Sequence, residues 1–136
     1  HTPVLLTMFT MVMATLVIAQ PLSASEKLVI LDLGTLGGTY SSAFAINERG
    51  QVVGESTTDP DSGETHAFLW QRGTMTDLGT LGGDTSQAFG INTQGQVVGQ
   101  AKLDAQIYHA FFWDGETMTD LGTLGGTTGN TAKAAL

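Results

Sequence analysis

The sequence contains no cysteine among its 136 residues. Disulfide bonds, zinc–thiolate sites and thiol catalysis are therefore excluded, and a folded domain has to rest on packing alone. Positive charge is scarce as well: five Lys and Arg stand against thirteen Asp and Glu, a formal net charge of −8. Five scattered cations cannot form the basic cluster that displaces counterions from phosphate. We therefore expect no nucleic-acid partner and no anionic membrane surface as a partner.

Charge of either sign is low. Asp, Glu, Lys and Arg make up 13% of the chain, against about 25% in a typical soluble domain. Thr, Ser, Gln and 18 glycines supply the polarity instead. This balance favours strands and turns over helices.

One long apolar run opens the chain. Residues Val4 to Ala19 carry no charge, and small residues follow at Pro21 to Ser25. The run is shorter than the about 20 apolar residues of a membrane-spanning helix, and its pattern is typical of a secretory signal peptide. We predict a signal-peptide helix in residues 1–25, with cleavage after Ala24 or Ser25 favoured over cleavage after Ala19. An uncleaved anchor or a buried segment is the alternative. Since the usual basic residues before the run are missing, we interpret the N-terminus as truncated.

The rest of the chain is repetitive. The heptapeptide DLGTLGG begins at Asp32, Asp77 and Asp120, first 45 and then 43 residues apart. A fixed period of this size is typical of repeat proteins, whose units bury their faces on their neighbours. We predict two repeats, about 32–76 and 77–119, plus the start of a third, within residues 26–127. Residues 128–136 form a divergent tail.

Glycine-containing turns divide each repeat into four short runs rich in β-branched and aromatic residues. Such runs predict strands and hairpins. The predicted strands are 42–47, 51–56, 66–70 and 74–78 in the first repeat, and 87–92, 96–101, 109–113 and 117–121 in the second. A polar loop, 57–65, separates the second and third strands of the first repeat.

Successive strand residues point to opposite faces. His66, Phe68 and Trp70 are therefore expected on one face and Ala67 and Leu69 on the other. Similarly, alternation places Phe44 and Ile46 opposite Ala43 and Ala45. Because both faces are largely apolar, each sheet has to be covered on both sides. We predict an all-β fold of tandem four-stranded antiparallel units in an incomplete, β-propeller-like stack, ahead of a β-solenoid or a sandwich.

The glycine-rich loop of the heptapeptide joins one unit to the next. We expect Leu36, Leu81 and Leu124 to fill the gaps between neighbouring sheets. A phosphate-binding role is disfavoured, because no lysine follows as in a P-loop and no helix begins there.

Three blocks carry a resemblance to a known family. His66-Ala67-Phe68, the segment from Ile46 to Gly54, and the heptapeptide from Asp77 resemble the extracellular HAF repeat family. The resemblance covers about Leu31 to Thr127. It implies an exported bacterial protein with tandem repeats, secreted or at the cell surface, and it supplies no activity and no catalytic residue.

The pattern ends after Thr127, where the expected first strand of a third repeat is replaced by Gly129 to Leu136. Propellers typically have four to eight blades, so two repeats cannot close a ring. We expect either a piece of a longer array, which is the favoured interpretation, or units that complete themselves by association.

Histidine and aspartate recur 11 residues apart, close to a tryptophan, as His66, Trp70 and Asp77 and as His109, Trp113 and Asp120. A carboxylate beside an imidazole can orient a general base or a metal ligand. Duplication in each repeat instead favours an internal hydrogen-bond network, since every copy supplies the same partner. Asn47 and Asn92 precede glycine turns, which asparagine stabilises by bonding its own backbone.

One loop has the character of a calcium site. Asp59, Asp61 and Glu64 lie within six residues, and calcium prefers several carboxylate and carbonyl oxygens. The loop lacks EF-hand spacing and its carboxylates are not repeated, so a solvated turn is the favoured interpretation. No other cofactor is expected.

These patterns predict an exported, non-catalytic module that binds an extracellular protein or glycan. Two alternatives remain: a fragment of a propeller-type extracellular enzyme acting on glycans, and a self-associating surface or matrix component. No Gly-x-Ser-x-Gly nucleophile elbow supports hydrolysis.

Overall fold

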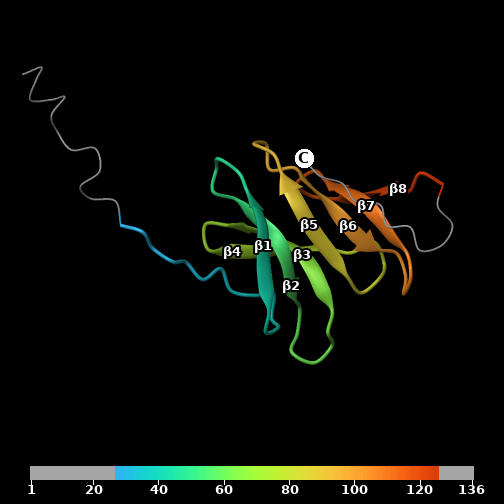
Figure 1. The fold of residues 1–136 in the computed structure, drawn as a ribbon, viewed down its shortest axis with the longest axis horizontal. Helices are drawn as coiled ribbons and strands as arrows, with labels where there is room; N and C mark the ends of the chain where they lie inside the picture. Colours follow the sequence, from blue (N-terminus) through green and yellow to red (C-terminus); the bar gives the residue numbers. More distant parts are fainter. Residues whose placement is uncertain (1–26, 126–136) are drawn as a thin grey trace, which may run out of the picture. The chain divides into compact units, whose positions relative to one another are not determined.

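The computed structural model describes residues 27–125, and all its strands lie in the unit that begins at Asp32 (Figure 1). The eight strands are β1 Ser41–Ile46, β2 Val52–Thr57, β3 Thr65–Gln71, β4 Thr74–Gly79, β5 Ser86–Ile91, β6 Val97–Lys102, β7 Tyr108–Trp113 and β8 Met118–Gly122. Within 27–125 no helix is present that is long and apolar enough to cross a membrane. The predicted signal-peptide helix and the divergent tail lie outside the described residues.

Each repeat forms one sheet. The strand orders are β1-β2-β3-β4 and β5-β6-β7-β8, and every neighbouring pair is antiparallel. The prediction of an all-β fold with tandem four-stranded antiparallel units is therefore confirmed. The observed strands differ from the predicted ones by one residue at most ends.

Turn chemistry explains where the strands end. Between β3 and β4, Arg72 and Gly73 both have positive φ, 50° and 85°, which matches a two-residue type I′ turn whose twist suits the flanking strands. Between β1 and β2, the Gly50 N–H donates to the Asn47 carbonyl at 3.1 Å, and Gly50 has a φ of 75°. Glycine adopts this conformation at little cost, since it has no Cβ.

The two sheets pack against each other through one face of each. The first sheet contributes Val53, Ala67 and Leu69, which share a face because Val53 pairs with Leu69 and Glu55 with Ala67. The second sheet contributes the face opposite to the one that is equivalent to Val53 and Leu69. This face carries Ala88, Val97, Ala101, Phe111 and Trp113. Leu78 completes this intersheet core, and Leu81 packs against it from the loop between β4 and β5. The predicted opposition of His66, Phe68 and Trp70 to Ala67 and Leu69 agrees with the register.

The side-chain assignment for β1 is wrong. The register shifts between Ala43, which pairs with Gly54, and Ala45, which pairs with Val53. Phe44 is the extra residue of a β-bulge, and such an insertion reverses the alternation beyond it. Ala43 and Ile46 consequently share a face, contrary to the simple alternation. The same bulge recurs in β5, between Ala88 and Gly90.

Some equivalent residues of the two repeats differ in exposure, because another sheet covers only one of the two. Leu78 is 7% exposed and lies in the intersheet core, whereas Leu121, in the same heptapeptide, is 55% exposed. Ala88 is buried against the first sheet, whereas its equivalent Ala43 is exposed. At these two positions burial is thus decided by the neighbouring repeat, whereas Val98 and Ala110 stay buried like their equivalents Val53 and Ala67. Of the loop leucines, Leu81 packs against the core as predicted, Leu36 is half-buried, and Leu124 is fully exposed among the described residues.

Candidate functional site

The histidine and aspartate of each repeat are in contact. Nδ1 of His66 on β3 lies 2.9 Å from both carboxylate oxygens of Asp77 on β4. In the second repeat, Nδ1 of His109 lies 2.8 Å and 2.9 Å from those of Asp120. Both histidine side chains are 18% exposed. The two pairs are therefore copies of one arrangement.

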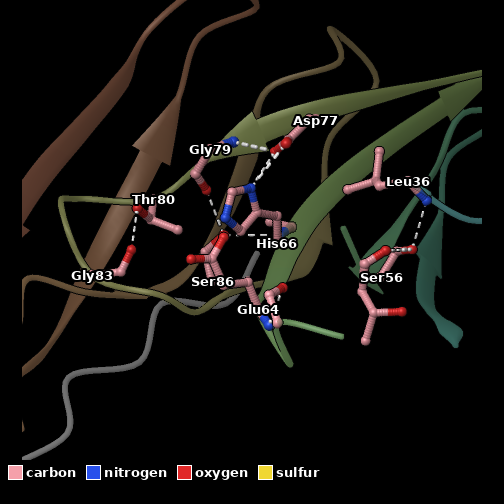
Figure 2. A network of polar contacts seen from close by, with 12 residues as sticks. Leu36, Ser56, Glu64, His66, Asp77, Gly79, Thr80, Gly83 and Ser86 are labelled. Carbon is pink, nitrogen blue, oxygen red and sulfur yellow. Dashed lines mark hydrogen bonds and ion pairs between the residues drawn. The ribbon is translucent and has the colours of Figure 1, made fainter. Parts of the chain in front are cut away.

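The same carboxylate also stabilises the following turn. Oδ1 of Asp77 accepts the Gly79 N–H at 2.7 Å (Figure 2). Asp120 accepts the Gly122 N–H in the same way. The β-bulge at β3 and β4 brings these groups together, because Phe68 pairs with Asp77 while Ala67 pairs with Gly79. Each Asp thus joins an imidazole and a turn, a structural task in which both carboxylate oxygens have partners.

A serine lies close to the first His–Asp pair (Figure 2). The Ser86 hydroxyl accepts the Ala67 N–H at 2.8 Å and donates to the Gly79 carbonyl. Ser86 has no exposed surface. Because its proton points to a carbonyl and its oxygen is already bonded, Ser86 is not arranged as a nucleophile activated by His66. It instead links β3 of the first sheet to β5 of the second.

Within residues 27–125 neither tryptophan side chain makes a hydrogen bond to this network. Trp113 is 8% exposed and belongs to the intersheet core, while Trp70 is half-buried at the equivalent position of the first sheet. The tryptophans act in packing, and in each repeat the imidazole contacts the carboxylate without them.

The two asparagines hold their turns by the expected bonds. Oδ1 of Asn47 accepts the N–H groups of Arg49 and Gln51, both at 3.0 Å. Oδ1 of Asn92 does the same for Gln94 and Gln96, at 3.1 Å and 2.9 Å. In addition, Nδ2 of Asn47 donates to the Asn92 carbonyl at 2.9 Å, which connects the two sheets.

The acidic loop between β2 and β3 forms a solvated turn. Oδ1 of Asp59 accepts the N–H groups of Asp61 and Ser62 at 2.7 Å and 2.8 Å, and these bonds lower the pKa of the Asp59 carboxyl. Asp59, Asp61 and Glu64 are all exposed. Within residues 27–125 no three His, Cys, Asp or Glu side chains gather as a metal site would require.

A groove that sequence reasoning missed lies where the two first strands end. It measures about 580 Å³ and is lined by Ile46 to Glu48 and by Ile91 to Thr93. Ile46 is 69% exposed, and the rings of Phe44 and Phe89 lie 5.7 Å apart. The bulges create this apolar surface by re-aiming residues that alternation would have turned elsewhere. Ile46 and Ile91 supply its apolar part, and Asn47, Glu48, Asn92 and Thr93 line it as well.

One ion pair joins the loop between β4 and β5 to the second sheet. Nζ of Lys102 lies 3.2 Å from Oδ1 of Asp84 and 5.4 Å from the centre of the Tyr108 ring. The hydrogen bond from Lys102 lowers the pKa of Asp84, and the same bond raises the pKa of Lys102. Sequence reasoning gave no signal for this pair, because Lys102 has no charged equivalent in the first repeat.

No family model, no curated protein and no solved structure matches this chain.

Proposed function

We propose that this chain is an exported, non-catalytic interaction module of the HAF repeat type, which binds an extracellular protein or glycan through the apolar surfaces of its sheets. The observation that carries the proposal is the duplication of the polar contacts. The His–Asp pair occurs with the same distances and the same histidine exposure in both repeats. A catalytic site needs polar residues that occur in one repeat and not in the others. A scaffold, in contrast, uses the same hydrogen bonds in every repeat.

The engagement of the candidate groups supports the same conclusion. Among the described residues, every buried side-chain nitrogen and oxygen has a hydrogen-bond partner. The serine next to His66 is bonded on both sides, and the carboxylate of Asp77 holds both an imidazole and a turn. Groups that are fully used in this way maintain structure.

Large apolar side chains also remain exposed. Ile46 is 69% exposed and Phe44 is 43% exposed, beside the groove at the ends of β1 and β5. Exposed apolar groups gathered beside a groove suit a protein partner or the apolar faces of a glycan.

Export is tested by producing the full chain in a bacterial host and sequencing the N-terminus of the protein outside the cytoplasm. A mature chain that begins at Ser25 or Glu26 is expected. An unprocessed chain that stays in the cytoplasm would overturn this part of the proposal.

The absence of catalysis is tested with His66→Gln and His109→Gln, singly and together. We expect each substitution to lower the unfolding temperature, and no reducing ends to be released from soluble polysaccharides by the parent chain. Release of reducing ends by the parent, abolished by one histidine substitution that leaves the unfolding temperature unchanged, would instead support the glycan-acting enzyme.

Calcium is tested separately. We expect 5 mM CaCl₂ and 5 mM MgCl₂ to leave the unfolding temperature equal, because the Asp59 carboxylate is committed to its own turn. A rise specific to calcium that Asp61→Asn removes would establish a calcium site in this loop.

A further inference from the structure

The segment before the first sheet has the sequence of a fourth strand. Asp32-Leu33-Gly34 repeats Asp77-Leu78-Gly79 and Asp120-Leu121-Gly122, which end β4 and β8. The turn is the same as well: Oδ1 of Asp32 accepts the Gly34 N–H at 2.9 Å, as the other two accept theirs at 2.7 Å. Residues 28–33 therefore correspond to the last strand of a sheet that precedes the first.

The segment is not itself a strand in the structure, although its sequence is that of one. Residues 27–40 form no strand, and Asp32 lacks the histidine that its two equivalents contact, because His66 and His109 are already paired. Leu28, Val29 and Ile30 are 100%, 74% and 96% exposed. Four consecutive apolar residues, Leu28 to Leu31, with strand-forming side chains and no partner are a site for pairing with another chain.

The second sheet offers a matching place beside β7. The resident fourth strand, β8, has five residues, one fewer than β4, and its Leu121 is 55% exposed. Aligning Asp32 with Asp120 puts Leu31 at the position of Thr119, opposite Phe112. The same alignment puts Ile30 at the position of Met118, which packs against the intersheet core. The incoming segment would therefore place apolar side chains where β8 has threonine, and its Asp32 would meet His109.

The chain that follows this segment would carry its own first sheet onto the second sheet of the other copy. Gly34 to Tyr40 leads into β1 as Gly79 to Thr85 leads into β5, and the anchoring bonds correspond. The Ser41 hydroxyl donates to the Gly34 carbonyl at 2.7 Å, as Ser86 donates to Gly79. Ser86 also accepts the Ala67 N–H, and the residue equivalent to Ala67 in the second repeat is Ala110.

We propose that copies of this chain join head to tail by strand exchange. Residues 28–33 of one copy replace β8 beside β7 of the next, and the first sheet of the donor covers the face of the acceptor's second sheet that carries Leu121, which is 55% exposed. The contact reproduces between copies the packing that already joins the two repeats within one copy. It rests on the proposed function, because removal of residues 1–25 leaves the exchanging strand at a free N-terminus.

Such a contact uses different surfaces on the two partners, so it is heterologous and extends until it closes. The partner is thus a second copy of this chain.

The first test measures the mass of the exported, processed chain by sedimentation velocity. The parent is expected at two or more protomer masses, and Ile30→Asp at one. Ile30 is 96% exposed, so the substitution leaves the fold of the protomer intact, which circular dichroism checks. The matched control Gln94→Asp adds the same charge to an exposed turn and is expected to assemble like the parent. A monomeric parent, or an Ile30→Asp variant that assembles like the parent, overturns the proposal.

The second test determines the register, which is straightforward in a chain without cysteine. Leu31→Cys combined with Phe112→Cys is expected to form disulfides between copies on oxidation, and Ile30→Cys with Phe112→Cys to form several-fold fewer, since its side chain points to the other face. The control pair Thr119→Cys and Phe112→Cys is expected to close within one copy, as β7 and β8 are paired there. Equal disulfide yields from the Leu31–Phe112 and Ile30–Phe112 cysteine pairs would overturn the proposed strand exchange. If the processed chain is monomeric yet still exported and inactive on polysaccharides, the exchange fails while the proposed function stands.

Discussion

The same leucine in the same heptapeptide has two different environments, and this permits a matched experiment. Leu78 is 7% exposed in the intersheet core, and Leu121 is 55% exposed on the second sheet. Leu78→Ala and Leu121→Ala remove the same three carbons from the same local sequence. Any difference between the two variants therefore reports what the neighbouring sheet contributes.

The magnitude follows from the burial of each side chain. Three buried carbons are worth about 2.4 kcal/mol at roughly 0.8 kcal/mol each, and the cavity left at Leu78 raises the loss to about 3 kcal/mol. At Leu121 less than half of the side chain is buried and water fills the space, so the loss is about 1 kcal/mol. The expected difference of about 2 kcal/mol corresponds to roughly 8–16 °C in unfolding temperature for a domain of this size.

Urea unfolding followed by tryptophan fluorescence measures both losses. Both substitutions are made in the Ile30→Asp background, so that association between copies does not contribute. Equal losses for the two leucines would refute the reasoning, because they would mean that the neighbouring sheet does not decide the stability of this position.

Three further predictions concern other positions. Gly99→Ala is expected to cost at least about 2 kcal/mol in urea unfolding, because a Cβ there would collide with the Gln87 carbonyl across the bulge; a neutral result would contradict the bulge geometry. Asp77→Ala and Asp120→Ala are each expected to lower the free energy of unfolding by about 1–2 kcal/mol, and the two losses are expected to agree within about 0.5 kcal/mol. A loss at one site alone would show that the two His–Asp pairs are not copies of one arrangement. The hydrogen bond from Lys102 lowers the pKa of Asp84, so the stabilisation that this ion pair gives is present above pH 3.8 and is lost as the pH falls through the lower pKa of the folded state. Asp84→Asn is therefore expected to lower the unfolding temperature at about pH 7 and to leave it unchanged at about pH 2. An equal effect at both pH values would contradict a stabilising ion pair between Asp84 and Lys102.

The strands could be predicted because each repeat carries its own local signals. Glycine turns such as the one at Gly73 end the strands, and a second copy of the pattern confirms each boundary. The faces of β3 could also be predicted, since Ala67 to Trp70 alternates without interruption.

The errors have a physical cause in the bulges and in the neighbours. Phe44 and Phe89 sit where each first strand gains a residue, and nothing in the alternation marks such an insertion. The different burial of Leu78 and Leu121 is not encoded locally either, because their heptapeptides are identical. It depends on which sheet lies opposite, and that is decided by the order of repeats along the chain.

The residues of the candidate site could be predicted where the same residues recur in both repeats. The 11-residue spacing of His66 and Asp77 marked their contact, and the position of Asn47 before a glycine turn marked its bonds. The role of Ser86 was not predictable, because its partners, the Ala67 N–H and the Gly79 carbonyl, come together only when the two sheets pack.

The packing of two repeat sheets through alternate faces is tested most directly by nuclear Overhauser effects in the methyl-labelled protein. The methyl groups of Val53 and Leu69 are expected to show effects to protons of Val97, Phe111 and Trp113, which share their core. Effects confined to residues of the same repeat would contradict the account, since they would show that each sheet buries its face on something other than its neighbour.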